Sequence, residues 1–105
     1  MIKHPALEKI KLGEMSPRAA ESALTRIWKA DPDAAPYIYT ALRGLTWKLC
    51  VGAVTMPLAD LRKWSLLIDR VARRAIQQPL VPEHAVYGYR MMALRDMFDL
   101  AWEHA

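Results

Sequence analysis

The sequence predicts an all-α fold, a compact single-domain bundle of about five helices joined by short, proline-marked turns. Prolines lie where helices are expected to begin, and proline is favoured there because the first N–H groups of a helix have no intrahelical partner. Between these prolines, apolar residues recur at intervals of three and four, which is the spacing of one helix face. At 105 residues, with 53% hydrophobic and 25% charged residues, the composition is typical of one packed core, so residues 1–105 are expected to form one helical domain.

Local signals set the bounds of the first two helices. Pro5 is expected to open the first helix, and Gly13 to close it as a C-terminal cap. Ser16 is in position to cap the second helix, with Pro17 as its first residue. The "DPD" of residues 31–33 is expected to end that helix. One apolar stripe runs along it: Ala20, Leu24, Ile27 and Trp28.

The third helix is predicted to run from near Asp33 to about Val54. Its latter half has a second apolar face in addition to the main stripe, and a helix that is apolar on both sides is typically central in a bundle. Residues 46–56 remain open between helix and a short strand, because two glycines weaken the helix and valine favours a strand. Helix is the favoured interpretation, since no second strand-like run exists. The second apolar face consists of Trp47, Cys50, Val51 and Val54.

The last two helices follow Pro57 and Pro82. The fourth is predicted to end near Gln78, and its apolar stripe is Leu58, Leu61, Trp64, Ile68, Val71, Ala72 and Ala75. The fifth is expected to continue almost to the C-terminus. Its large apolar residues surround the helix axis, so some of them must face outward or toward another chain. They are Tyr87, Tyr89, Met91, Met92, Met97, Phe98 and Trp102.

The fourth helix carries a basic face opposite its apolar stripe. At 100° per residue, five cations fall within about 120° of one another: Arg62, Lys63, Arg70, Arg73 and Arg74. One interpretation is the solvated side of an amphipathic helix. The other is a docking surface for phosphates or for an acidic protein patch. Leu66 lies in the same sector, which favours a protein partner because an aliphatic side chain suits a protein interface.

The fifth helix is the second candidate surface. Methionine and tyrosine adapt well to interfaces, the first through its flexible thioether and the second through apolar area combined with a hydroxyl. The expected partner-binding residues are Tyr87, Tyr89, Met91 and Met92. Burial in the core and a homodimer seam are the alternatives. The acidic residues of this helix could also pair with the basic face of the fourth: Asp96, Asp99 and Glu103.

The formal net charge is +4, with a pI near 9.5, and this balance permits nucleic-acid binding without requiring it. Residues 12–28 have the order of a helix-turn-helix scaffold. However, the next turn lacks glycine, and the helix after it offers only Arg43 for base edges. Direct nucleic-acid binding through the basic face of residues 62–74 is therefore the alternative prediction, and a structural homo-oligomer is the second alternative.

Catalytic motifs are not found in the sequence, so no enzyme activity, cofactor or metal is expected. The histidines His4, His84 and His104 lack the HxxxH and HExxH spacings of metal sites, and no glycine-rich phosphate loop occurs. Cys50 lies in an apolar run, where a buried hydrophobic role is expected rather than a thiol–imidazole pair with His84.

A single cysteine indicates a reducing compartment. The sequence shows neither an apolar signal-peptide core nor a run long enough to span a bilayer, so the expected location is the cytoplasm, away from membranes. The predicted function is that of a small helical interaction protein that binds a larger protein or nucleoprotein complex and acts by occlusion or scaffolding. An adaptor, an assembly factor or an inhibitor would fit, and a phage or mobile-element inhibitor is one concrete version.

Overall fold

The computed structural model describes residues 4–105, and this part of the chain consists of helices and the turns between them. The predicted all-α bundle is therefore confirmed. No strand occurs within residues 4–105. Residues 46–50 are helical, and residues 51–56 form a turn and irregular structure. The five α-helices are α1 (Pro5–Leu12), α2 (Pro17–Ala30), α3 (Ala35–Cys50), α4 (Leu58–Gln77) and α5 (Ala85–Glu103).

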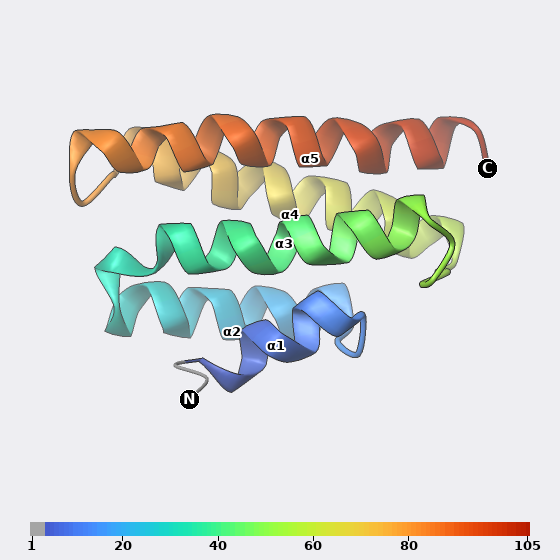
Figure 1. Ribbon diagram of the computed structural model, residues 1–105, viewed down its shortest axis with the longest axis horizontal. Coiled ribbons are helices and arrows are strands. Elements are labelled where there is room, and N and C mark those ends of the chain that lie inside the picture. Colours follow the sequence, from blue (N-terminus) through green and yellow to red (C-terminus); the bar gives the residue numbers. More distant parts are fainter. Residues whose placement is uncertain (1–3) are drawn as a thin grey trace.

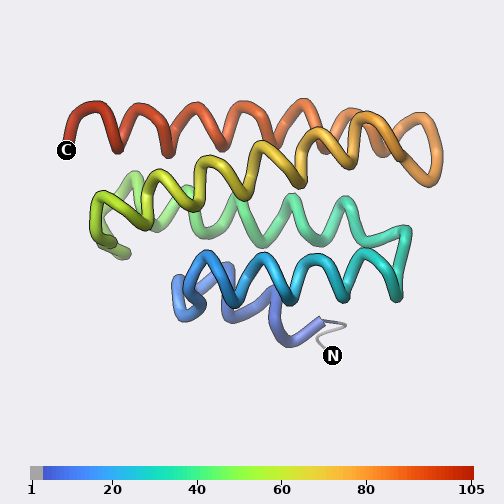
Figure 2. The backbone as a smooth tube through the Cα atoms, turned by 180° about the vertical axis from the view of Figure 1, so that it is seen from behind, coloured from blue at the N-terminus to red at the C-terminus, as the bar shows by residue number. Residues whose placement is uncertain are grey.

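The four longer helices, α2 to α5, alternate in direction along the chain (Figure 1). As a result α3 and α5 run the same way, and α2 and α4 run the opposite way. Seen from the front, α3 crosses the middle of the bundle and α1 lies in front below it. The rear view shows α2 and α4 on the other side, with α5 along one edge (Figure 2). The most extensive pairing joins α4 to α5, while α3 packs against both α1 and α5.

Proline and serine fix the helix starts as the sequence predicts. The hydroxyl oxygen of Ser16 accepts a hydrogen bond from the backbone N–H of Ala19 at 3.2 Å, and Pro17 is the first residue of α2. Before α3 and α5 the first turn is a 3-10 turn, Pro32–Ala34 and Pro82–His84 respectively. These two helices therefore begin slightly later than the positions of Asp33 and Pro82 suggest.

Glycines end two of the helices in the left-handed conformation. Gly13 and Gly52 both have φ of 77°, which suits glycine because it has no Cβ. After α3, the N–H of Gly52 donates to the carbonyl of Leu49 at 3.2 Å and the N–H of Ala53 to that of Lys48 at 2.9 Å. This cap ends α3 at Cys50, so the prediction that it continues to Val54 is wrong.

One hydrophobic core receives side chains from all five helices. The stripe predicted for α2 is buried throughout, and so is that of α4 apart from Leu58 at its first turn. The rings of Trp64 and Phe98 lie 6.3 Å apart between centroids, which joins α4 to α5 at the centre. The fully buried large apolar side chains are Ile10, Ile38, Leu42, Leu45, Ile68, Met91 and Phe98.

Gly88 allows α5 to approach α4 closely. A Cβ atom at this position would lie 2.7 Å from the carbonyl oxygen of Ala72 and 2.6 Å from Cγ1 of Ile76. The carbonyl belongs to the α4 backbone, so it cannot move away unless the helix itself moves. The α4–α5 spacing at this level therefore depends on the missing side chain.

We expect Gly88→Ala to lower the free energy of unfolding by about 1–3 kcal/mol, because the new methyl group overpacks the α4–α5 contact. Gly44→Ala is the matched control: it is also a glycine within a helix, but its Cβ would meet Cγ of Lys11, a flexible side chain. There we expect a smaller loss, because the Lys11 side chain can rotate away without movement of the α3 backbone and because alanine has the higher helix propensity. Urea unfolding of both variants measures the difference, and equal stabilities would contradict the close-contact explanation.

Candidate functional site

The five predicted cations lie on the side of α4 away from the core, and the helix itself lies on the side of the bundle seen from behind (Figure 2). This surface is called the basic face below: Arg62, Lys63, Arg70, Arg73 and Arg74. The side chains of Arg62, Arg70 and Arg73 are about half exposed. Leu66 lies among them with 44% of its surface exposed, as expected for its sector. The helical spacing of these residues is confirmed, but whether they bind a partner stays a prediction.

Acidic and aromatic side chains of α5 contact one end of the basic face. The guanidinium of Arg62 lies 3.6 Å from a carboxylate oxygen of Asp99, and it also lies over the ring of Trp102, 5.6 Å from its centroid. Asp99 accepts a short hydrogen bond from the hydroxyl of Ser65 on α4. The structure thus shows, for Asp99, the intramolecular pairing with α4 that the sequence left as an alternative.

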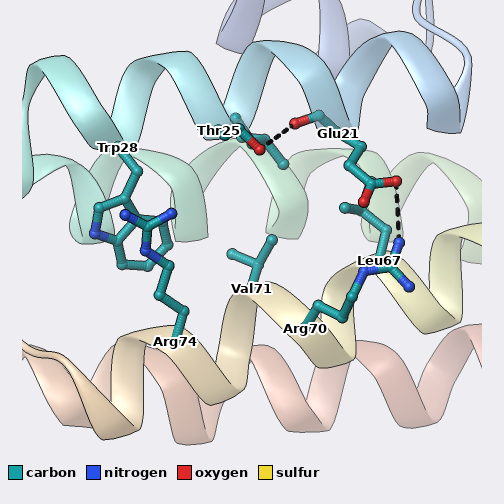
Figure 3. A pocket seen from close by; sticks show the side chains of 8 residues that line it. Glu21, Thr25, Trp28, Leu67, Arg70, Val71 and Arg74 are labelled. Carbon is teal, nitrogen blue, oxygen red and sulfur yellow. Dashed lines mark hydrogen bonds and ion pairs between the residues drawn. The ribbon is translucent and has the colours of Figure 1, made fainter.

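On the other side, the basic face meets α2 around a shallow hollow of ≈ 160 Å³ (Figure 3). Arg70 forms an ion pair with Glu21 at 3.0 Å. The guanidinium of Arg74 lies over the indole ring of Trp28, 5.0 Å from its centroid. Both arginines extend from α4 toward α2, with Val71 between them in the hollow. These contacts hold the guanidinium groups in defined positions.

Asp69 connects the basic face to α5. It accepts hydrogen bonds from Arg73 at 2.8 Å and from Arg95 of α5 at 2.6 Å. The bond from Arg73, supported by the one from Arg95, holds the pKa of the Asp69 carboxyl below its usual value, although burial acts in the opposite direction. Arg95 also bonds Asp96, and the carboxylates of Asp96 and Asp69 raise its pKa. The result is an ion network across the α4–α5 seam.

Because the pKa of Asp69 is lowered in the folded state, its contribution to stability is present above the unfolded value of about 3.9 and is lost as the pH falls through the lower folded value. We expect Asp69→Asn to cost about 1 kcal/mol at pH 7 for this partly exposed network. The deficit relative to the unmodified protein should shrink as the pH falls below about 4. Urea unfolding at pH 7, 4 and 2.5 tests this, with Glu14→Gln as a control for an exposed carboxylate; a deficit independent of pH would contradict it.

The predicted residues of α5 do not share one surface. Tyr89 is exposed, whereas Tyr87 and Met92 are partly buried against the core. Met91 is fully buried at 0% exposure, so its prediction as a partner-binding residue is wrong. It lies one turn after Gly88 on the helix face that packs against α4, where no partner can reach it. The exposed apolar residues of α5 that the prediction omitted include Met97, Leu100 and Trp102.

Tyr87 has contacts within the chain. Its ring lies 5.9 Å from that of Tyr39 on α3, and the guanidinium of Arg90 lies within 6 Å of both ring centroids, at 5.7 and 5.9 Å. This cluster closes the seam between α3 and α5 near their N-terminal ends. The aromatic ring of Tyr87 is therefore engaged largely in packing within the chain.

A groove of ≈ 680 Å³ lies between the later halves of α3 and α5. Trp47 on one wall is 68% exposed, and Met97 on the other is 41% exposed. Cys50 lines the same groove and is exposed, so its predicted burial is wrong. The reason is that the second apolar face of α3, at the end of the helix, is open to solvent. The sequence signal for this groove is that second apolar face together with Met97.

His84 lies far from the cysteine. His84 contacts Asp33 at 3.3 Å, next to the start of α3, whereas Cys50 is the last residue of that helix. The 16 residues of α3 separate the two by roughly 24 Å at 1.5 Å per residue. A thiol–imidazole pair between them does not form. Within residues 4–105, no three histidine, cysteine or acidic side chains come together in a way that could hold a metal ion.

Searches of protein-family models, of curated proteins and of solved structures gave no significant match to this chain. A functional interpretation therefore depends on the geometry of its own surfaces. In the described part of the chain, no helix combines the length and apolar character needed to cross a bilayer.

Proposed function

We propose that this chain is a small helical interaction protein that binds an acidic surface of a larger protein, alone or within a nucleoprotein complex, through its basic face. The mechanism is occlusion or scaffolding rather than catalysis. An adaptor, an assembly factor or an inhibitor, including one of phage or mobile-element type, would work in this way. We place this activity in the cytoplasm, as the single cysteine of the sequence predicts.

The observation that carries the proposal is the excess of positive charge that remains after internal pairing. Five cations form the basic face, and three carboxylates contact them: Glu21, Asp69 and Asp99. Lys63 has no ion pair within residues 4–105. Exposed ion pairs of this type contribute only about 0–1 kcal/mol each, so a carboxylate of a partner can replace an internal one at small cost.

The pre-set geometry of the arginines also supports binding. Rings of Trp28 and Trp102 hold two of the guanidinium groups, which reduces the side-chain entropy lost when a partner binds. Leu66 adds an exposed aliphatic contact in the middle of the charges. A surface of fixed charges around an apolar residue resembles the composition of protein interfaces.

A protein partner fits better than nucleic acid. Carboxylates stand among the arginines, and Glu21 and Asp69 would repel phosphates. The ring of Trp28 is buried beneath Arg74, which leaves Trp102 as a single exposed ring next to the face, whereas sites for single-stranded nucleic acid use several aromatic platforms. Nucleic-acid binding by the same arginines is the alternative outcome, and it would show a steep loss of affinity with salt.

We expect the variant Arg70→Gln/Arg73→Gln/Arg74→Gln to keep the helical circular-dichroism signal while losing its protein partner. Neutral glutamine removes the charges without placing new carboxylates beside Glu21 and Asp69. The control variant, Lys9→Gln/Arg26→Gln/Lys29→Gln, removes the same charge from exposed positions outside the basic face and should keep the partner. The measurement is affinity capture from the source cells after nuclease treatment, followed by titration of the purified partner against all three proteins.

Each result has a definite meaning. Capture that disappears with nuclease would replace the protein partner by nucleic acid. Equal binding by both variants would show that the basic face is only the solvated side of α4. Loss of the helical signal in the first variant would show that its ion pairs serve the fold, and single substitutions at Arg70 and Arg74 would then separate binding from folding.

A further inference from the structure

The groove between α3 and α5 has an apolar lining. Besides Trp47, Cys50 and Met97, its wall includes Leu94 of α5. The two threonines that line it have their hydroxyl donors already bonded within α3: Thr46 to the carbonyl of Leu42 at 2.7 Å, and Thr40 to that of Pro36 at 2.9 Å. What these residues leave facing the groove is mainly hydrocarbon, sulfur and an indole ring.

Cations stand at the rim of this groove. Lys11 of α1 and Arg43 of α3 both line it, and no aspartate or glutamate does. Gly44 explains the position of Lys11: a Cβ there would lie 2.6 Å from Cγ of Lys11 and 3.4 Å from its Cδ and Cε. The aliphatic part of the lysine thus rests on the α3 backbone, and a cation from a different helix reaches the groove.

The two walls are parallel helices, since α3 and α5 run in the same direction (Figure 1). Apolar residues continue beyond the groove at helical spacing, with Val51 one turn after Trp47 and Leu100 one turn after Met97. An apolar groove between two helices matches the ridge of a third helix.

We propose that this groove binds one amphipathic helix of another protein, with its apolar face against Trp47 and Met97 and with carboxylates beside Lys11 and Arg43. Charge complementarity identifies the partner as acidic. The groove is lined by residues of α1, α3 and α5, and none of them belongs to the basic face of α4, so the inference does not depend on the proposed function of α4.

Other occupants fit less well. A second copy related by a two-fold axis would bring one cationic rim against another, which repels. Single-stranded nucleic acid would find one exposed ring and two cations around a floor of thiol, thioether and aliphatic groups, whereas such sites use several aromatic platforms along a charged path.

Model peptides provide the test, with the isotope-labelled full chain observed by NMR. The first probe is a helical peptide of about five turns, with leucines on one face and glutamates on the other. The second has lysine in place of every glutamate, and the third is a scrambled sequence of the first. We expect only the first to shift the indole N–H signal of Trp47, while the signals of the buried Trp28 and Trp64 stay in place.

Three variants sharpen the test. Trp47→Ala should weaken binding of the acidic peptide by about tenfold or more, as removal of a central aromatic contact does. Met97→Glu places a carboxylate in the groove and should also repel this peptide. The variant Arg70→Gln/Arg73→Gln/Arg74→Gln should bind it as the unmodified chain does, which separates a failure at the groove from a failure at the basic face. Trp47 and Met97 are exposed, so neither substitution is expected to unfold the chain.

Several results would overturn the proposal. It fails if the acidic peptide leaves the Trp47 signal unchanged, or if the lysine peptide shifts it equally. It also fails if a thymidine oligonucleotide produces the same shift, which would make the groove a nucleic-acid site. A Trp47 shift that depends on protein concentration alone, together with a dimer mass in light scattering, would assign the groove to a second copy.

Discussion

The bundle is organised around the close contact between α4 and α5, its most extensive helix pairing. Gly88 brings α5 against the backbone of Ala72, and the core residues Met91 and Phe98 follow on the same helix face. This contact also determines the electrostatics, because it places Arg95 and Asp99 of α5 beside Asp69 and Arg62 of α4. A single helix pairing thus contributes both to core packing and to the charge arrangement of the basic face.

That pairing has opposite effects on the basic face. It neutralises part of the positive charge, since Asp99 and Asp69 form ion pairs with arginines that would otherwise attract a partner. It also orders the same arginines, and ordered side chains lose less entropy on binding. Whether these arginines bind a partner therefore depends on competition between the carboxylates of that partner and the carboxylates of the chain itself. A partner must present carboxylates in a better arrangement than the internal ones, and this requirement favours a specific protein surface over a uniform polyanion.

The sequence was most informative where polar and apolar residues are cleanly separated. The stripes of α2 and α4 have one apolar side, so burial followed directly from spacing for Trp28, Trp64 and their neighbours. In α3 and α5 apolar residues occur on more than one side, and spacing cannot decide which side another helix will cover. For this reason the burial of Met91 and the exposure of Cys50 were both mispredicted. The end of α3 depends on the left-handed conformation of Gly52. A glycine in the sequence permits this conformation but does not require it.

The two candidate surfaces differ in chemistry and lie on different helices, and this arrangement bears on mechanism. The basic face offers charge with little apolar area, which favours fast, salt-sensitive association. The groove at Trp47 offers apolar area with a few cations, which favours slow dissociation of one helix. A chain that only blocks a site needs one such surface. Two surfaces of different chemistry on a rigid bundle can hold two acidic partners at a fixed separation, so if both are occupied, the geometry argues for scaffolding over simple occlusion.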